Sequence, residues 1–267
     1  MKSVARGFTL IEMSIVLVII GLIVGGILTG RQLIRTSELH SLITDELKYI
    51  TAVNTFRTKY GALPGDMLDA TNIWGADPQG CPYNAPPYTA PQITTCNGNG
   101  NGLIQNDGTG ENNNPDFKYE NFRAWQQLAD AKLIPGAYTG TPGLSSWTDN
   151  ELGLNVPATK ISNGGFEWTA FNASARYPAT IWNAQYNTQY LLLGGGNSGT
   201  DLVNPLLSPQ DAQAIDSKID DGLSGSGNVL GSDLYDSNGS CLVSPAGPYN
   251  VSNKAPYCTL LFMIKSW

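Results

Sequence analysis

Histidine is almost absent from this chain: His40 is the only one among 267 residues. A Ser/His/Asp or Cys/His catalytic group needs a histidine beside its nucleophile, and we interpret His40 as an ordinary helix residue. The GxSxG, P-loop and HExxH patterns are also missing. The run Gly194-Gly195-Gly196 lacks the spacing of a dinucleotide-binding motif and is interpreted as a turn. We therefore expect a protein that is not an enzyme.

Positive charge is scarce as well. The chain has 15 lysines and arginines against 22 aspartates and glutamates, for a net charge of −7, and only 14% of its residues are charged. Binding to nucleic-acid phosphates needs a surface rich in lysine and arginine, so we expect no nucleic-acid partner. The 30 glycines and 16 prolines are typical of a loop-rich β or α+β domain.

Cysteine occurs only four times, as two sequence-local pairs, Cys81 with Cys96 and Cys241 with Cys258. No CxxC spacing is present, which disfavours a zinc site. An even cysteine count in an exported domain favours disulfides, each closing a loop of roughly 15 residues and stabilising the fold by about 3 kcal/mol. Of the possible connectivities, we predict the two local pairings.

A long apolar run stands near the N-terminus. From Phe8 to Gly30 there are 23 residues, and Glu12 is the only ionisable side chain among them. At roughly 1.5 Å per residue, such a helix is long enough to cross a hydrocarbon core of about 30 Å. A carboxylate inside a membrane helix costs up to about 3 kcal/mol, so Glu12 is expected to have a partner.

The short basic leader from Met1 to Gly7, followed by Phe8-Thr9-Leu10-Ile11-Glu12, resembles the class III signal of type IV prepilins and type II secretion pseudopilins. The resemblance implies cleavage after Gly7, N-methylation of Phe8, and a role for Glu12 in neutralising the Phe8 amine of a neighbouring subunit. It also implies partners: a prepilin peptidase and methyltransferase, other pilin or pseudopilin subunits, and an inner-membrane assembly platform. The chain would then cross the bacterial inner membrane once, with its C-terminal domain in the periplasm.

Two simpler interpretations of the N-terminus stay open. A secretory signal peptide has an apolar core of about 7–15 residues and a small-residue cleavage site, whereas this apolar run is longer and contains Glu12. A plain single-pass anchor accounts for the length of the run but not for Glu12 or the leader.

The helical pattern continues beyond Gly30, and one helix is predicted to reach Tyr60, with Gly61 as its stop. We therefore divide the chain into a leader (1–7), a membrane-spanning or filament-core helix (8–30), an amphipathic continuation (31–60) and an extracytoplasmic globular domain (61–267). The apolar stripe of the continuation consists of Leu39, Leu42, Ile43, Leu47, Ile50, Val53, Phe56 and Tyr60.

The globular domain is predicted to be α+β, an antiparallel sheet packed on the long N-terminal helix in a pilin-like arrangement. We expect a loop stapled by cysteines over residues 75–115. Predicted helices lie near Leu68, from Asn114-Pro115 to Lys132, and from Ser208 to Ile219 with a stop at Gly222. Predicted strands are 165–172, 190–193 and 258–264.

Asn97, Asn99 and Asn101 alternate with glycines, like the opening of a Ca²⁺-binding loop. Asparagine replaces the usual aspartates, and glycine stands where a bidentate glutamate is expected, so Asp107 or Glu111 would have to complete the site. The alternative is a series of Asn-Gly turns without an ion. We expect no other cofactor.

Asp216, Asp220 and Asp221 resemble a metal-binding cluster or an acid/base pair, but two of them are adjacent and Lys218 is near. We interpret them as a solvated helix end.

These features predict a structural subunit, minor or specialised, of a type IV pilus or a type II secretion pseudopilus. One alternative is an adhesin or ligand-binding module displayed on such a filament, which exposure of Trp147, Trp168 and Trp182 would favour. Another is an unpolymerised, membrane-anchored extracytoplasmic binding protein.

Overall fold

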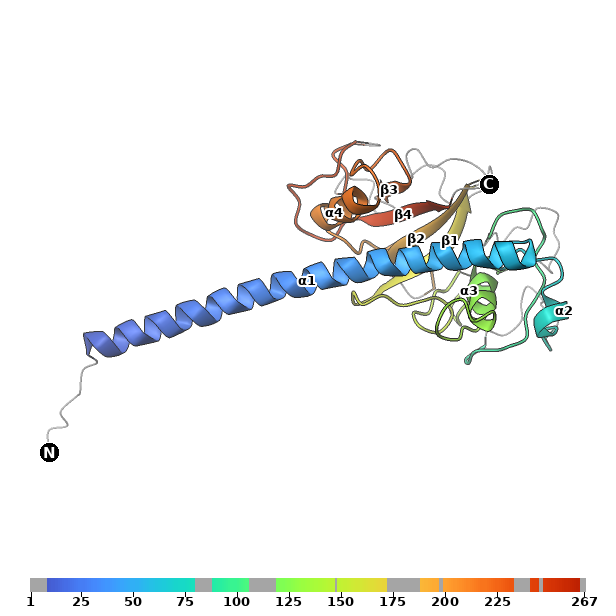
Figure 1. The fold of residues 1–267 in the computed structure, drawn as a ribbon, viewed down its shortest axis with the longest axis horizontal. Helices are drawn as coiled ribbons and strands as arrows, with labels where there is room; N and C mark the ends of the chain where they lie inside the picture. Colours follow the sequence, from blue (N-terminus) through green and yellow to red (C-terminus); the bar gives the residue numbers. More distant parts are fainter. Residues whose placement is uncertain are drawn as a thin grey trace, which may run out of the picture. The chain divides into compact units, whose positions relative to one another are not determined.

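The computed structural model describes residues 9–79, 88–105, 119–146, 148–171, 188–196, 199–232, 241–244 and 247–264. The chain divides into two compact units, residues 1–41 and residues 42–267, and each is described by itself. Figure 1 labels the helices and strands along the ribbon.

One helix, α1 (Leu10–Tyr60), runs through both units. It ends at Gly61, whose φ is +72°, and the N–H of Gly61 donates to the carbonyl of Arg57 at 2.8 Å. Glycine enters this left-handed conformation without a steric penalty and therefore commonly ends helices. The prediction of a single long helix that stops at Gly61 is confirmed from Leu10 onward.

In the first unit, α1 exposes its apolar side chains: Leu10 is 92% exposed and Leu22 is 73% exposed. The helix is long and apolar enough to cross a membrane. Because exposing so much apolar surface to water is unfavourable, this part of α1 requires lipid or other helices around it.

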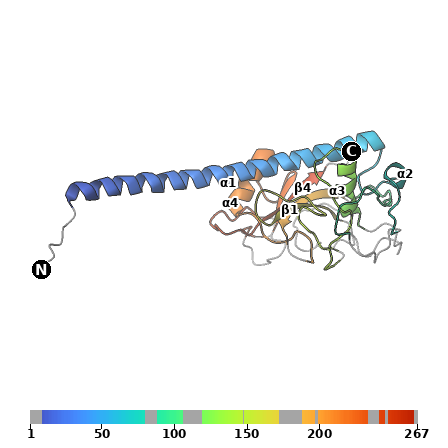
Figure 2. The ribbon, with the colours of Figure 1, turned by 90° about the horizontal axis from the view of Figure 1, so that it is seen from below.

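In the second unit, the last part of α1 supplies one side of a hydrophobic core. The ring of Tyr49 meets Trp125 and Phe166 edge-on, with centroids 4.9 and 5.3 Å apart. Trp125, on α3 (Glu120–Asp130), stacks on Trp168 at 4.8 Å. These aromatic contacts join α1, α3 and the sheet, which lie beside one another in Figures 1 and 2.

The sheet has four antiparallel strands in the order β1-β2-β4-β3. They are β1 (Gly164–Phe171), β2 (Thr188–Gly195), β3 (Val229–Ser232) and β4 (Thr259–Ile264). The α+β fold class and three of these strands match the sequence prediction.

Helix α4 (Pro209–Ile219) contacts β3 and begins as predicted. The hydroxyl of Ser208 accepts the N–H of Asp211 at 3.2 Å and donates to its carboxylate at 2.8 Å. Pro209 follows at the first helical position, where its missing N–H costs nothing.

Two predicted helices are wrong in their bounds. The short helix is α2 (Thr71–Trp74) and not a helix near Leu68. A continuous helix from Asn114-Pro115 is excluded at Tyr119, whose φ of +73° is left-handed, so α3 starts at Glu120. Residues 106–118 lie outside the described part of the chain.

The turn predicted at Gly194-Gly195-Gly196 is also wrong, because Gly194 and Gly195 belong to strand β2. A Cβ at Gly194 would lie 1.8 Å from the carbonyl oxygen of Leu202. Glycine is therefore required here by the close approach of another segment and not by a turn.

The described part of the predicted cysteine-stapled loop is held by polar side chains of α3. The guanidinium of Arg123 donates to the carboxylate of Asp77 at 2.8 Å, and both residues are buried. The hydroxyl of Tyr88 donates to the same carboxylate at 2.5 Å. The side-chain amide of Gln126 donates to the carbonyls of Gln92 and Thr94, each at 2.9 Å. These bonds give the loop a fixed position without regular secondary structure.

The disulfide between Cys241 and Cys258 is confirmed. Cys96 is disulfide-bonded as well. Its predicted partner, Cys81, lies outside the described residues, so that pairing stays a prediction.

Replacing Arg123 with alanine is predicted to destabilise the second unit strongly. Removing one partner of a buried ion pair leaves the other charge uncompensated, at a cost of about 3–5 kcal/mol. Chemical denaturation of Arg123→Ala and wild type would measure this. The exposed Lys160→Ala variant is the control, expected to change stability by less than about 0.5 kcal/mol. An equal effect of the two substitutions would contradict the assigned role of Arg123.

Candidate functional site

The first candidate site is the start of α1, where Thr9 and Glu12 form a reciprocal pair. The carboxylate oxygen Oε2 of Glu12 accepts the backbone N–H and the hydroxyl of Thr9, both at 2.8 Å. The Thr9 hydroxyl oxygen in turn accepts the N–H of Glu12 at 3.3 Å. This is a capping box, which satisfies N–H groups that a helix start leaves without partners.

The pair leaves part of Glu12 available. Both hydrogen bonds from Thr9 fall on Oε2, and within the described residues Oε1 has no hydrogen-bond donor. No other ionisable side chain occurs on α1 before Arg31. A cation for Oε1 must therefore come from outside the described helix. Gly7 and Phe8, which would supply the cleavage site and the new amine, lie outside the described residues.

Taken together, a long apolar helix, an acidic residue in its first turn and an antiparallel sheet with helices define an α+β layout consistent with a pilin-like fold.

Comparison with protein families agrees with this class. Residues 2–28 match the family described as the prokaryotic N-terminal methylation motif. This motif is the prepilin-type signal of type IV pilins and pseudopilins, so the N-terminal segment of the chain is similar to theirs. The motif and the apolar helix also fit membrane anchoring. Neither a curated protein nor a solved structure matches the chain.

The predicted Ca²⁺ loop uses its asparagine oxygens to hold its own backbone and a neighbouring helix. Oδ1 of Asn97 accepts the N–H of Thr71, and Oδ1 of Asn99 accepts the N–H of Asn101, each at 2.9 Å. Oδ1 of Asn101 accepts the N–H of Leu103 at 2.9 Å. Asp107 lies outside the described residues. The asparagines thus form hydrogen-bonded turns, and Ca²⁺ binding stays a prediction.

The loop folds around the carboxylate of Asp66, a residue of another segment whose role the sequence pattern does not reveal. Asp66 accepts the N–H groups of Asn101 at 3.0 Å and Gly102 at 2.9 Å. Burial raises the pKa of Asp66 to about 6, and these N–H bonds partly oppose the rise. Glu120 accepts the N–H groups of Asn99 and Gln105 in the same way, at 3.0 and 3.1 Å. The loop therefore turns several of its backbone N–H groups toward the buried carboxylates of Asp66 and Glu120.

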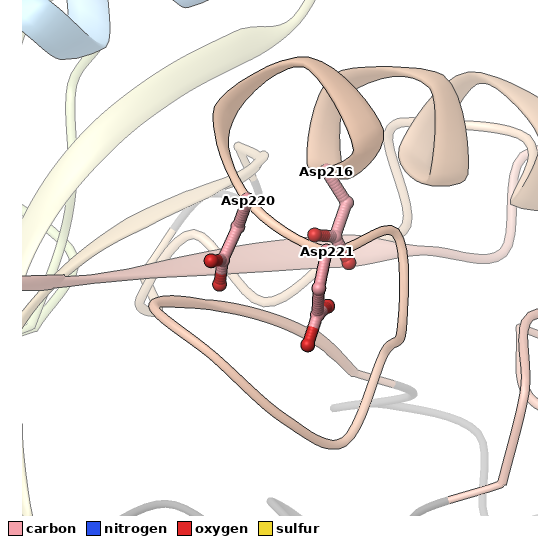
Figure 3. Close-up of side chains that lie close together, drawn as sticks. All are labelled: Asp216, Asp220 and Asp221. Carbon is pink, nitrogen blue, oxygen red and sulfur yellow. The ribbon is translucent and has the colours of Figure 1, made fainter.

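The second acidic cluster, at the end of α4, has a structural role for each carboxylate. One carboxylate oxygen from each of Asp216, Asp220 and Asp221 lies within 4.8 Å of the other two. Figure 3 shows these three side chains. Asp216 accepts the hydroxyl of Tyr249 at 2.8 Å and the N–H of Gly222 at 3.1 Å.

The other two aspartates hold the loop that follows α4. Asp220 accepts the backbone N–H of Asn228, and Asp221 accepts the hydroxyl of Ser226 at 2.6 Å. The interpretation as a solvated helix end is correct for the exposed Asp221. It is wrong for Asp216, which is fully buried and whose pKa burial raises to about 6.

The aromatic patch that would favour an adhesin is not supported at the residue that the structure describes. Trp168 is completely buried and stacks on Trp125. Trp147 and Trp182 lie outside the described residues.

A buried acid pair is a site for which the sequence gives no spacing evidence. Glu167 on β1 shares a hydrogen bond with the carboxyl group of Asp201, and both side chains are buried. Glu167 also accepts the N–H of Leu202 at 2.9 Å and the side-chain amide of Asn150 at 3.2 Å. Burial, and then the neighbouring Asp201 charge, raise the pKa of Glu167 well above its usual value. No spacing in the sequence links these residues, because they come from three separate segments.

This pair predicts that stability falls as pH rises. The folded protein holds the Glu167 proton more tightly than the unfolded chain, whose glutamates have a pKa of about 4.3. The contribution of Glu167 is therefore complete below about pH 4.3 and is lost as pH rises through the higher folded pKa. Glu167→Gln should flatten this pH dependence and match or exceed wild-type thermal stability at alkaline pH.

Thermal midpoints measured across the acidic to alkaline range check this prediction. Glu151→Gln is the control, because this half-buried residue is close in the chain but outside the pair. Identical pH profiles for wild type and Glu167→Gln would show that the pair does not control stability.

Proposed function

We propose that this protein is a structural subunit, minor or specialised, of a type IV pilus or a type II secretion pseudopilus. It is cleaved after Gly7, methylated at Phe8 and assembled through α1 with other pilin or pseudopilin subunits. The observation that carries the proposal is the match of residues 2–28 to the N-terminal methylation motif. The size of the globular unit supports a specialised subunit over a typical major pilin.

The physical reason for assembly lies in the charges at the start of α1. Cleavage after Gly7 would place a new amine at Phe8, four residues before Glu12. In an apolar bundle an isolated ammonium and an isolated carboxylate are each costly, whereas a close pair is tolerated. Since Glu12 keeps Oε1 free of donors among the described residues, a neighbouring subunit's amine has an acceptor ready. Such a pair would fix the axial register between subunits.

The first prediction from this proposal concerns processing. In cells with the cognate prepilin peptidase, the mature protein should begin with N-methylated Phe8. Intact-mass and N-terminal peptide spectrometry would measure this. Gly7→Val should keep the leader, because its branched side chain occupies the cleavage position. A wild-type protein that retains Met1 would instead favour the unpolymerised membrane-anchored protein.

The second prediction concerns Glu12. Glu12→Gln keeps the side chain's size and its ability to cap Thr9, but removes the charge. Both Glu12→Gln and Glu12→Ala should insert into the membrane normally and lower the subunit recovered in sheared filaments by tenfold or more, since breaking a buried charge pair costs about 3–5 kcal/mol.

The comparison of the two variants separates charge pairing from capping. If capping alone mattered, Glu12→Gln would assemble like wild type and Glu12→Ala would not. Thr9→Val, which removes the hydroxyl but keeps the Glu12 charge, is the matched control and should retain most assembly. Wild-type filament levels in Glu12→Gln would therefore contradict the role of the Glu12 charge in fixing the axial register.

A further inference from the structure

A cavity of about 570 Å³ opens in the second unit beside the last turn of α1. Its walls are the end of α1 with the following residues, the turn at residues 100–103, and the end of the sheet. The sheet contributes Gln189 of β2 and Ile264 of β4, which are direct cross-strand partners. The volume is in the range of about 300–1,000 Å³ that is usual for sites that bind small molecules.

The interior of the cavity is partly apolar. Leu63, Leu103 and Ile264 line it, and the 61% exposed side chain of Leu68 lies at its edge. Gly102 also lines the cavity, and a Cβ added there would meet no atom within 4 Å. An apolar ligand group would therefore find both contact surface and space.

Two oppositely charged side chains, Arg57 and Asp69, line the same cavity. Within the described chain, neither the guanidinium of Arg57 nor the carboxylate of Asp69 has a hydrogen bond or an ion pair. Two further polar side chains of the lining are occupied: Asp66 accepts loop N–H groups, and Gln189 accepts the N–H of Ile104 at 2.6 Å. Arg57 and Asp69 are thus the charged groups available to a ligand.

We propose that this cavity binds a small zwitterion with an apolar body, namely a free apolar amino acid or a dipeptide. Its carboxylate accepts hydrogen bonds from Arg57, whose planar guanidinium suits a carboxylate. Its ammonium group faces Asp69, and its side chain lies against Leu63, Leu103 and Ile264. A simple anion would meet Asp69 unfavourably, and a simple cation would meet Arg57. The proposal is independent of filament assembly, because every residue involved belongs to the second unit.

Titration calorimetry of the full chain in detergent micelles tests this site. The probes are L-leucine and leucyl-leucine, which distinguish a free amino acid from a dipeptide, with N-acetyl-leucine and leucinamide as analogues that each lack one charge. At least one zwitterion should bind saturably at millimolar concentration or below. Each analogue should bind about tenfold more weakly, as expected for the loss of one charge-assisted hydrogen bond.

Substitutions test which side chains contact the ligand. Arg57→Gln and Asp69→Asn should each weaken zwitterion binding about tenfold, and Arg57→Gln should also abolish the preference for L-leucine over leucinamide. Lys59→Gln is the matched control, an exposed cation in the same helical turn that does not line the cavity, and it should bind like wild type. Unchanged thermal midpoints would show that the variants are folded.

The outcomes that overturn the proposal are equally specific. No saturable binding of either zwitterion would remove the site. Binding of N-acetyl-leucine as tight as that of L-leucine would identify an anion site and contradict the role of Asp69. Equal loss of binding in Lys59→Gln and Arg57→Gln would show a nonspecific charge effect.

Discussion

The carboxylate of Glu12 sets the main physical constraint on this protein, because it is the only ionisable side chain in an apolar run of 23 residues. Thr9 satisfies one of its oxygens within the same chain, through two hydrogen bonds of 2.8 Å. This local pairing lets the helix start form in a single chain and lowers the cost of placing the carboxylate near lipid. It does not neutralise the charge. Neutralisation requires a cation, and the proposed assembly supplies one from a neighbour.

The same helix meets a different requirement in the second unit. There it contributes Tyr49 and Phe56 to an aromatic core, so its apolar residues follow one face instead of surrounding the helix. A change from apolar on all sides to apolar on one side marks a change of surroundings along one continuous element. Because its apolar pattern changes along its length, α1 belongs to both compact units.

Outside its helices and sheet, the second unit is ordered by carboxylates and amides. Asp66 and Glu120 accept backbone N–H groups of the segment at residues 99–105, and Asp216 and Asp220 do the same after α4. A loop-rich chain has many backbone donors that no ladder satisfies, and burying them unpaired is costly. Acidic side chains that resemble metal ligands in the sequence are thus used to complete the backbone hydrogen bonding.

Local signals explain which elements the sequence predicts. The spacing of Leu42, Val53 and Phe56 predicts the second part of α1, and Ser208-Pro209 predicts the start of α4, because each depends on residues within a turn or two. The start of α3 and strand β3 depend on distant partners. Tyr119 takes a left-handed conformation in its tertiary setting, and the four-residue β3 is defined by pairing with β4.

The candidate sites also divide into those that depend on neighbouring residues and those that depend on distant ones. The role proposed for Glu12 follows from its position in a contiguous motif, and the motif comparison covers the same residues. Glu167 and Asp201 are far apart in the chain, and the cavity joins Arg57 and Asp69 to Gln189 and Ile264 of the sheet, so no short window of sequence contains either site. Residue type alone was also misleading for Asp216, where burial and a tyrosine hydroxyl decide the role.

Glu46 and Glu12 are glutamates on the same helix, α1, but their surroundings give them different consequences. It lies on the part of α1 that packs in the second unit, is buried, and has one carboxylate oxygen without a hydrogen-bond partner among the described residues. Burial raises its pKa to about 7, so it is largely protonated in the folded protein in mildly acidic conditions. A neutral carboxyl can be buried in a core without a counter-ion, whereas a charged carboxylate in an apolar bundle needs one. Glu46 is therefore compatible with a single folded chain, while Glu12 favours the approach of a second one.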